Sequence, residues 1–142
     1  MIEKHILRVI DKLAKVGLDK IRQELGDGRI DDSGDPIPGV HLDPPIIERL
    51  LEFIAINAYT SAEVVTQLEN ALPENEARDD ALADMRDLAE ALEALNIDEQ
   101  HARFTPSLAR GLDYYTGPVF EMIVPDAPEL GALMAGGRYN QL

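Results

Sequence analysis

Residues 109–121 hold the side chains of this chain that are best suited to bind a small molecule. The segment reads Ala-Arg-Gly-Leu-Asp-Tyr-Tyr-Thr-Gly-Pro-Val-Phe-Glu, and it contains two of the four tyrosines of a protein that is only 5% aromatic. Arg110 is a permanent cation whose forked guanidinium suits a carboxylate or a phosphate. Tyr114 and Tyr115 offer flat rings with a hydroxyl at the tip, which suit an aromatic or heterocyclic ligand. The alternative is structural: Arg110 pairs with a nearby carboxylate, and the tyrosines pack in a core.

Two segments give the chain a family resemblance. Residues 110–121 resemble the histidine-specific motif of histidyl-tRNA synthetases, and residues 135–139, Ala-Gly-Gly-Arg-Tyr, resemble the glycine-rich segment that follows it in that family. A weaker resemblance covers residues 12–39, where Lys-Leu-Ala-Lys-Val-Gly-Leu and Gly-Arg-Ile-Asp-Asp-Ser-Gly-Asp are similar to the stretch after the second class II motif. Two motifs in the family's order and at a familiar separation are far more specific than a single glycine pattern.

The resemblance implies a site where histidine is activated. In that reaction the carboxylate of histidine attacks the α-phosphate of ATP, and the histidyl group then passes from histidyl-adenylate to tRNA(His). By resemblance, Arg110 is the catalytic cation that stabilises the charge developing on the α-phosphate. The resemblance also implies that Tyr115 hydrogen-bonds the imidazole of the substrate and that Tyr139 lines the same pocket. Gly136 and Gly137 let the backbone pass close to the substrate.

Other positions match the motifs without an assigned contact. Asp113, Tyr114 and Glu121 are interpreted as supporting residues. The sequence departs from the family pattern at Asn140-Gln141, where the usual residues are Asp-Gly. The local turn is therefore the part of the site that the resemblance defines least.

The resemblance implies that ATP and Mg2+ are substrates of the full-length enzyme. We expect no cofactor or metal ion to be bound by protein ligands of this chain. The chain has no cysteine, and its three histidines are isolated in the sequence. Asp31, Asp32 and Asp35 form an acidic cluster. It lacks the spacing of an EF-hand and the glutamate that closes such a loop, so we interpret it as a solvated acidic loop.

The resemblance also predicts that the chain is a fragment. In the family a helical insertion lies between the second class II motif and the histidine-specific motif, which belongs to the antiparallel catalytic sheet. The chain is similar to that insertion followed by part of the sheet, without the other class II motifs and without an anticodon-binding domain. We expect it to be inactive alone. The full-length enzyme is expected to be a cytoplasmic homodimer that acts on histidine, ATP and tRNA(His).

Two alternatives stay open. The first is a synthetase-like regulatory subunit of ATP phosphoribosyltransferase, which senses histidine without activating it. An intact Arg110 argues against this alternative, because a sensor has no transition-state charge to stabilise. The second is a non-catalytic interaction module, in which the helical part binds a protein partner.

The composition is that of a globular protein, and the negative net charge disfavours binding to nucleic acid. The chain has 142 residues, 45% of them hydrophobic, and no apolar run approaches the roughly 20 residues needed to cross a bilayer. Its net charge is −14. Residues 105–142 hold two arginines and four carboxylates, so the preceding residues carry −12. Because affinity for nucleic acid scales with Lys and Arg contacts to phosphates, we expect weak or no tRNA binding by the chain alone.

Most of the chain before residue 100 has helical periodicity. Five apolar residues lie on one face of a predicted helix that ends at Gly17: Ile2, Ile6, Val9, Ile10 and Leu13. Asp19 is placed to cap a short helix over residues 20–25. Residues 29–41, rich in aspartate, glycine and proline, are typical of a loop without regular structure.

Three more helices follow from local signals. Asp43 before Pro44 and Pro45 predicts a helix start, and Thr60-Ser-Ala-Glu63 is a capping box that opens the next helix. A long helix spans about residues 76–95. Its predicted apolar face consists of five residues at helical spacing: Ala81, Met85, Leu88, Leu92 and Leu95.

After residue 100 the pattern changes to short strand-like runs at 102–105, 119–124 and 130–135. The last two are separated by a proline-rich turn and are predicted to form a hairpin. We therefore expect an α+β fold with a boundary near residue 104. A helical insertion-like domain covers residues 1–104, and residues 105–142 form part of the antiparallel sheet of a class II synthetase catalytic core.

Overall fold

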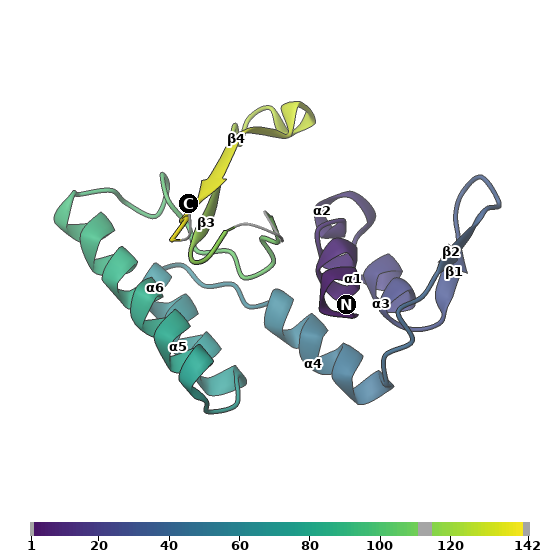
Figure 1. Ribbon diagram of the computed structural model, residues 1–142. Coiled ribbons are helices and arrows are strands. Elements are labelled where there is room, and N and C mark those ends of the chain that lie inside the picture. The colour runs from purple at the N-terminus through teal and green to yellow at the C-terminus, as the bar shows by residue number, and fades with distance from the viewer. Residues whose placement is uncertain (1, 111–114, 141–142) are drawn as a thin grey trace. The chain divides into compact units, whose positions relative to one another are not determined.

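The structure is a computed structural model that describes residues 2–110 and 115–140 (Figure 1). Six α-helices and two small antiparallel sheets form within these residues, which confirms the predicted α+β class. The contacts divide the chain into two compact units, residues 1–55 and 56–142, and each is described by itself. Among the described helices, none is long and apolar enough to cross a membrane.

The first unit begins with three short helices, α1 (Ile2–Ile10), α2 (Leu13–Val16) and α3 (Leu18–Leu25). The single helix expected up to Gly17 is interrupted after Ile10, where the N–H of Lys12 donates to the carbonyl of Val9 at 3.1 Å in a tight turn. Gly17 separates α2 from α3 at a φ of 80°, a conformation that glycine adopts without steric cost. Gly17 also takes the N-cap position that was expected of Asp19, so that prediction was wrong.

The core of this unit is built around α3 and α4 (Pro44–Ile54). α4 begins at the predicted position after Asp43, although the side chain of Asp43 makes no capping hydrogen bond. Each buried aliphatic side chain contributes about 1.5–3 kcal/mol relative to an exposed one. The buried apolar residues of the unit are Val9, Ile10, Ile21, Leu25, Ile47, Leu51 and Ile54.

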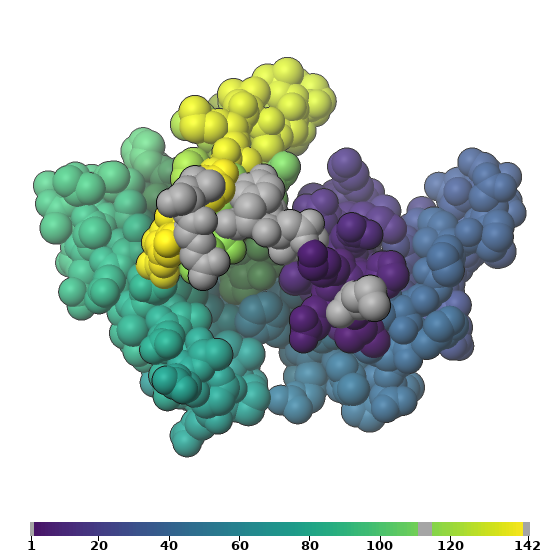
Figure 2. Space-filling view, in the orientation of Figure 1, coloured from purple at the N-terminus to yellow at the C-terminus, as the bar shows by residue number. Residues whose placement is uncertain are grey.

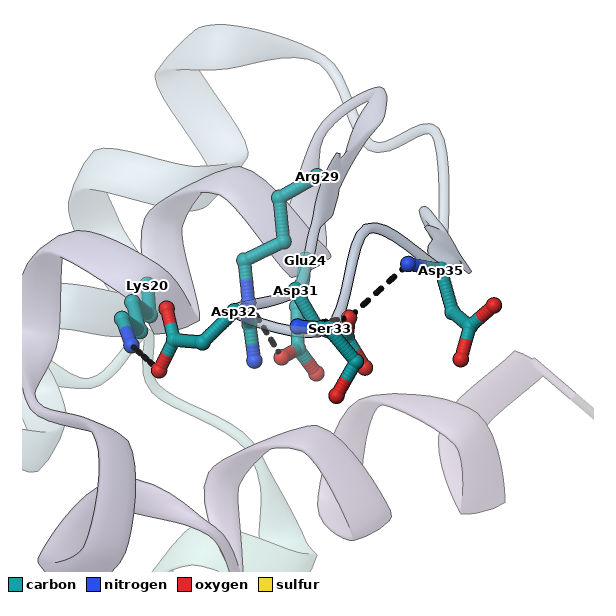
Figure 3. A network of polar contacts seen from close by, with 7 residues as sticks. All are labelled: Lys20, Glu24, Arg29, Asp31, Asp32, Ser33 and Asp35. Atoms are coloured by element: carbon teal, nitrogen blue, oxygen red, sulfur yellow. Dashed lines mark hydrogen bonds and ion pairs between the residues drawn. The ribbon is translucent and has the colours of Figure 1, made fainter.

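Residues 28–38 form a small hairpin where the sequence predicted an irregular loop. β1 (Gly28–Ile30) pairs antiparallel with β2 (Pro36–Pro38). Asp31 organises the connecting turn, because its Oδ1 accepts from the N–H groups of Ser33 at 2.8 Å and Asp35 at 2.9 Å (Figure 3). The prediction failed because proline is tolerated on an edge strand, and both strands of this sheet are edges.

Glu24 on α3 is a fully buried carboxylate held between two cations. Its Oε1 accepts from Nε of Arg29 at 2.9 Å, as Figure 3 shows, and its Oε2 accepts from Nζ of Lys12 at 2.7 Å. Burial raises the pKa of Glu24, but the bonds from Lys12 and Arg29 outweigh burial and leave that pKa below its ordinary value. The two ion pairs fasten the turn at Lys12 and strand β1 to α3.

The second unit opens with two helices that lie side by side (Figure 1), α5 (Ser61–Ala71) and α6 (Glu76–Ala94). The predicted capping box is confirmed. Oγ1 of Thr60 accepts from the N–H of Glu63 at 3.2 Å, and the carboxylate of Glu63 accepts from the N–H of Thr60 at 3.1 Å. The side-chain oxygen of Asn75 caps α6 by accepting from the N–H of Arg78 at 2.9 Å.

The buried stripe of α6 shares Met85 and Leu92 with the predicted one, but it is centred on Leu82. Leu82 is 2% exposed, whereas Leu88 and Leu95 of the predicted stripe are 38% and 69% exposed. The half-buried residues continue from Leu82 at helical spacing: Met85, Ala89 and Leu92. Both stripes repeat at three and four residues, so periodicity alone does not identify the one that packs against α5.

Residues 95–110 follow α6 without a helix or strand, so the strand predicted at 102–105 is absent. The segment is fastened to the start of α5 by Glu99. Its carboxylate accepts from the N–H of Ser61 at 2.7 Å and from Oγ of Ser61 at 3.0 Å. A negative charge at this position also interacts favourably with the helix dipole.

The C-terminal hairpin forms as predicted. β3 (Val119–Ile123) pairs antiparallel with β4 (Ala132–Gly137), and the connecting loop contains a short 3-10 helix, η1 (Pro128–Leu130). Phe120 lies opposite Gly136, and Met122 lies opposite Met134. The large apolar side chains around the hairpin loop, Leu130, Leu133 and Met134 among them, are more than half exposed, and this loop is the yellow-green segment at the top of Figure 2.

The change from helices to strands lies inside the second unit. The structure divides between Ala55 and Ile56, and α5, α6, β3 and β4 belong to one compact unit. A contact between Arg138 and Asp84, with Nη2 and Oδ2 at 2.8 Å, joins the end of β4 to α6 across the boundary expected near residue 104.

Candidate functional site

The first motif runs into the start of β3, and the second motif begins in the last residues of β4. Asp113 and Tyr114 lie outside the described residues, so their supporting roles stay predictions. The other predicted site residues are described and all belong to the second unit: Arg110, Tyr115, Glu121, Gly136, Gly137 and Tyr139.

Main-chain hydrogen bonds continue the pairing beyond the ends of the two strands. The N–H of Thr116 donates to the carbonyl of Arg138 at 2.8 Å, and the N–H of Arg138 donates to the carbonyl of Pro118 at 3.0 Å. Oγ1 of Thr116 accepts from the N–H of Asn140 at 2.9 Å. The two motifs therefore form one continuous antiparallel ladder. Asn140, where the sequence departs from the family pattern, joins this ladder through its main chain, which most residue types can supply.

This ladder brings two tyrosines from different motifs together. The ring of Tyr115 meets the ring of Tyr139 edge to face, with 5.0 Å between the centroids and an angle of 64°. Such an arrangement contributes about 0.5–1.5 kcal/mol beyond the buried area. Tyr139 is 45% exposed and Tyr115 is half-buried, and these two residues are called the tyrosine pair below.

The two glycines of the second motif lie beneath aromatic rings. A Cβ atom at Gly137 would fall 2.7 Å from the ring of Tyr115, and one at Gly136 would fall 2.5 Å from the ring of Phe120. Both distances are shorter than a carbon–carbon contact allows. A side chain at either position would therefore force the ring above it to move, while the close approach of a substrate to these positions stays a prediction.

Arg110 pairs with Glu121. Nε of Arg110 contacts Oε2 of Glu121, and their side chains are 42% and 20% exposed. The contact joins the first residue of the first motif to the middle of β3. The structure thus contains the ion pair of the structural interpretation. Because a guanidinium has five N–H donors and this one is partly exposed, Arg110 also retains capacity for an anionic ligand.

Sequence reasoning missed the group formed by Asp84, Gly117 and Arg138. The hydrogen bond to Asp84 on α6 raises the pKa of Arg138. The guanidinium lies against Gly117, where a Cβ atom would fall 2.4 Å from Nε of Arg138. No spacing rule relates a residue of α6 to one after β4. The sequence indicated a role for this group only through Arg138, which belongs to the second motif, Ala-Gly-Gly-Arg-Tyr.

Other parts of the described chain offer less to a ligand. Within residues 2–110 and 115–140 no three His, Cys, Asp or Glu side chains form a group that could hold a metal ion. The carboxylate of Asp31 accepts hydrogen bonds from main-chain N–H groups, and these bonds lower the pKa of Asp31. The bond from the N–H of Asp35 has the largest effect. A surface depression on α5 contains no residue of either motif; it is lined by Ala62, Glu63, Thr66 and Gln67.

Comparison with known proteins agrees with the motifs. The family model described as histidyl-tRNA synthetase matches residues 7–142. The histidine–tRNA ligase of Finegoldia magna is 34% identical over 136 residues, which are 96% of this chain and 28% of that protein. That of Paracoccus denitrificans is 37% identical over 145 residues, covering 96% and 29%. That of Clostridium tetani is 31% identical over 139 residues, covering 98% and 29%.

The chain thus spans less than a third of the length of these curated relatives. No solved structure matches it significantly. The family model extends over nearly all of the chain, including both units and both motifs. The chain therefore belongs to the histidyl-tRNA synthetase family.

Proposed function

We propose that this chain supplies the histidine-recognition segment of a histidine–tRNA ligase, which activates histidine with ATP and transfers it to tRNA(His). The observation that carries the proposal is the meeting of Tyr115 and Tyr139. They come from separate motifs, and the ring of Tyr115 rests on Gly137. Two partly exposed phenol groups beside a backbone ladder are suited to a flat heterocycle with polar nitrogens, such as imidazole.

Arg110 is the proposed catalytic cation. Glu121 contacts it through Nε and thereby fixes the direction of the guanidinium. A fixed cation beside the α-phosphate stabilises charge that develops there as the carboxylate of histidine attacks. Glu121 is in this view a supporting residue, because its carboxylate repels a phosphate and acts by orienting Arg110.

ATP and Mg2+ act in this proposal as substrates of a longer parent polypeptide, and residues outside this chain position the phosphates. The isolated chain is then inactive, since positioning of reactants is worth on the order of 7–11 kcal/mol in well-oriented systems. The homodimeric state and the cytoplasmic location of the parent are further parts of the proposal, and they rest on the family resemblance.

Pyrophosphate exchange tests the proposed function. A longer parent that carries this sequence should exchange labelled pyrophosphate into ATP when histidine is present, and the 142-residue chain should not. Histidine binding without exchange by the parent would favour the regulatory subunit of ATP phosphoribosyltransferase. A parent that neither binds histidine nor exchanges pyrophosphate would favour the interaction module.

A further inference from the structure

The segment that carries the tyrosine pair is anchored at Arg138. The main chain of Arg138 makes two bonds to the first motif, since its carbonyl accepts from the N–H of Thr116 at 2.8 Å and its N–H donates to Pro118 at 3.0 Å. Arg138 follows Gly137, on which the ring of Tyr115 lies, and precedes Tyr139. A displacement of Arg138 relative to the first motif would therefore change the distance between the two tyrosines.

The side chain of Arg138 is fixed from two directions. Its guanidinium lies against Gly117, where even a methyl group would come within 2.4–2.8 Å of the guanidinium atoms. Its Nη2 reaches Oδ2 of Asp84 at 2.8 Å, which is a normal length for a charge-assisted hydrogen bond. Asp84 is 37% exposed and belongs to α6, which packs against α5.

We propose that Asp84 is a positioning residue for histidine recognition: through Arg138 it holds the ladder on which Tyr115 and Tyr139 meet. The helices α5 and α6 thereby act on the histidine pocket of the same unit. The inference rests on the proposed function for the identity of the ligand. The effect of Asp84 on the order of the ladder does not depend on which ligand binds.

Hydrogen exchange on the 142-residue chain tests the ordering. Asp84→Asn removes the charge at nearly constant volume and should speed exchange of the Thr116 and Arg138 amides about two- to fivefold, the range expected for a partly exposed ion pair. Asp84→Glu keeps the carboxylate and should restore most of the protection. Glu69→Gln is the matched control, because it breaks a similarly exposed 2.7 Å ion pair with Arg86 of α6 that involves neither motif.

A merely structural role would have a different result. In that case Asp84→Asn would speed exchange throughout α5 and α6, while a positioning role confines the change to residues 115–118 and 137–140. Equal exchange at Thr116 in Asp84→Asn and Glu69→Gln would overturn the proposal. If Asp84→Asn unfolds the chain, Arg138→Lys gives the same test, because lysine keeps the charge but lacks the fork that matches a carboxylate.

Kinetics of the parent test the link to histidine. Asp84→Asn should raise the KM for histidine about two- to fivefold in pyrophosphate exchange and leave kcat and the KM for ATP unchanged. An unchanged KM for histidine would overturn the link. A wild-type parent without histidine-dependent exchange would instead contradict the proposed function, and the exchange data on the chain would still show whether Asp84 orders the ladder.

Discussion

At the scale of single residues, the site depends on glycines that leave room for large side chains to lie against the main chain. Gly136, Gly137 and Gly117 each lie beneath a side chain, respectively the rings of Phe120 and Tyr115 and the guanidinium of Arg138. Removing Cβ at these positions lets planar groups lie directly on the backbone. The same planar groups come from both motifs, so the glycines make the two motifs mutually dependent.

Replacing Arg110 separates its two roles. In the parent, Arg110→Ala should lower kcat for pyrophosphate exchange by about 10²–10³-fold, the usual effect of losing one group that stabilises transition-state charge, with little change in the KM for histidine. Arg86→Ala is the control, because Arg86 is also a partly exposed arginine paired with a carboxylate but lies on α6. A near-normal turnover of Arg110→Ala would remove its catalytic role and leave only the ion pair with Glu121.

Replacing Tyr115 by phenylalanine tests recognition of the imidazole. The ring and its contact with Tyr139 are retained, and only the hydroxyl is lost. The KM for histidine should rise about three- to tenfold, as expected for one hydrogen bond, with a smaller effect on kcat. Tyr59→Phe, at a tyrosine that is 77% exposed and outside both motifs, should have no effect. Equal KM values for the Tyr115 and Tyr59 variants would contradict the assignment.

At the scale of elements, the sequence predicted a helix end correctly where neighbouring side chains hydrogen-bond the free N–H groups of that end. The capping box at Thr60 and Glu63 needs only residues three apart, and it forms as predicted. The stripe of α6 depends instead on which side faces α5. Leu82 and Leu88 lie in different stripes of similar spacing, so the sequence could not choose between them. The hairpin at residues 28–38 was missed because its prolines also suit a loop.

The capping box should contribute measurably to stability. Thr60→Ala removes the hydroxyl that accepts from Glu63 and should lower the free energy of unfolding by about 1 kcal/mol. Thr66→Ala is the control within the same helix, because Oγ1 of Thr66 bonds back to the carbonyl of Ala62 and caps nothing. Urea unfolding followed by far-UV circular dichroism measures both. A Thr66 variant that loses as much as the Thr60 variant would show that the cap is unimportant.

The buried carboxylate of α3 makes stability depend on acid. Because the pKa of Glu24 is lower in the folded chain than its ordinary value of 4.5, its contribution is complete above pH 4.5 and is lost as the pH falls through the lowered value. Glu24→Gln should therefore be less stable than the wild type at pH 7, by about 1.5–3 kcal/mol for lost charged hydrogen bonds, and the difference should shrink toward pH 3.

Urea unfolding at pH 7, 5 and 3 checks this dependence. Glu48→Gln is the control in the same unit, because Glu48 pairs with Arg22 while both side chains are about half exposed. That variant should differ little from the wild type at any of the three pH values. A constant difference between Glu24→Gln and the wild type from pH 7 to pH 3 would show that the charge of Glu24 does not stabilise the fold.

At the scale of the whole molecule, the sequence predicted the class of fold and the family, and it predicted less of the arrangement. The motifs around Arg110 and Tyr139 identified the family because their residue types are specific and contiguous. The ion pair between Asp84 and Arg138 was missed because it joins elements far apart in the sequence. The division at residue 55 was likewise missed, since it depends on which helices contact one another and not on composition.

The charge of the whole molecule leads to a prediction about tRNA. The net charge is −14, and α6 alone carries seven carboxylates and two arginines. Charges on the chain act over a Debye length of about 8 Å at physiological ionic strength, so any phosphate near α6 is repelled. The isolated chain should bind tRNA(His) with a dissociation constant weaker than about 10⁻⁴ M at 150 mM salt, as measured by fluorescence anisotropy of labelled tRNA.

A longer parent provides the comparison, because the proposed function assigns the contacts with tRNA phosphates to segments outside this chain. It should bind tRNA(His) more tightly than the chain does, with an affinity that falls as salt rises, because each Lys or Arg contact to a phosphate releases counterions. Micromolar, salt-sensitive binding by the 142-residue chain itself would contradict the electrostatic argument. It would mean that a few local cations, such as Arg103 or Arg110, outweigh the field of the acidic helices.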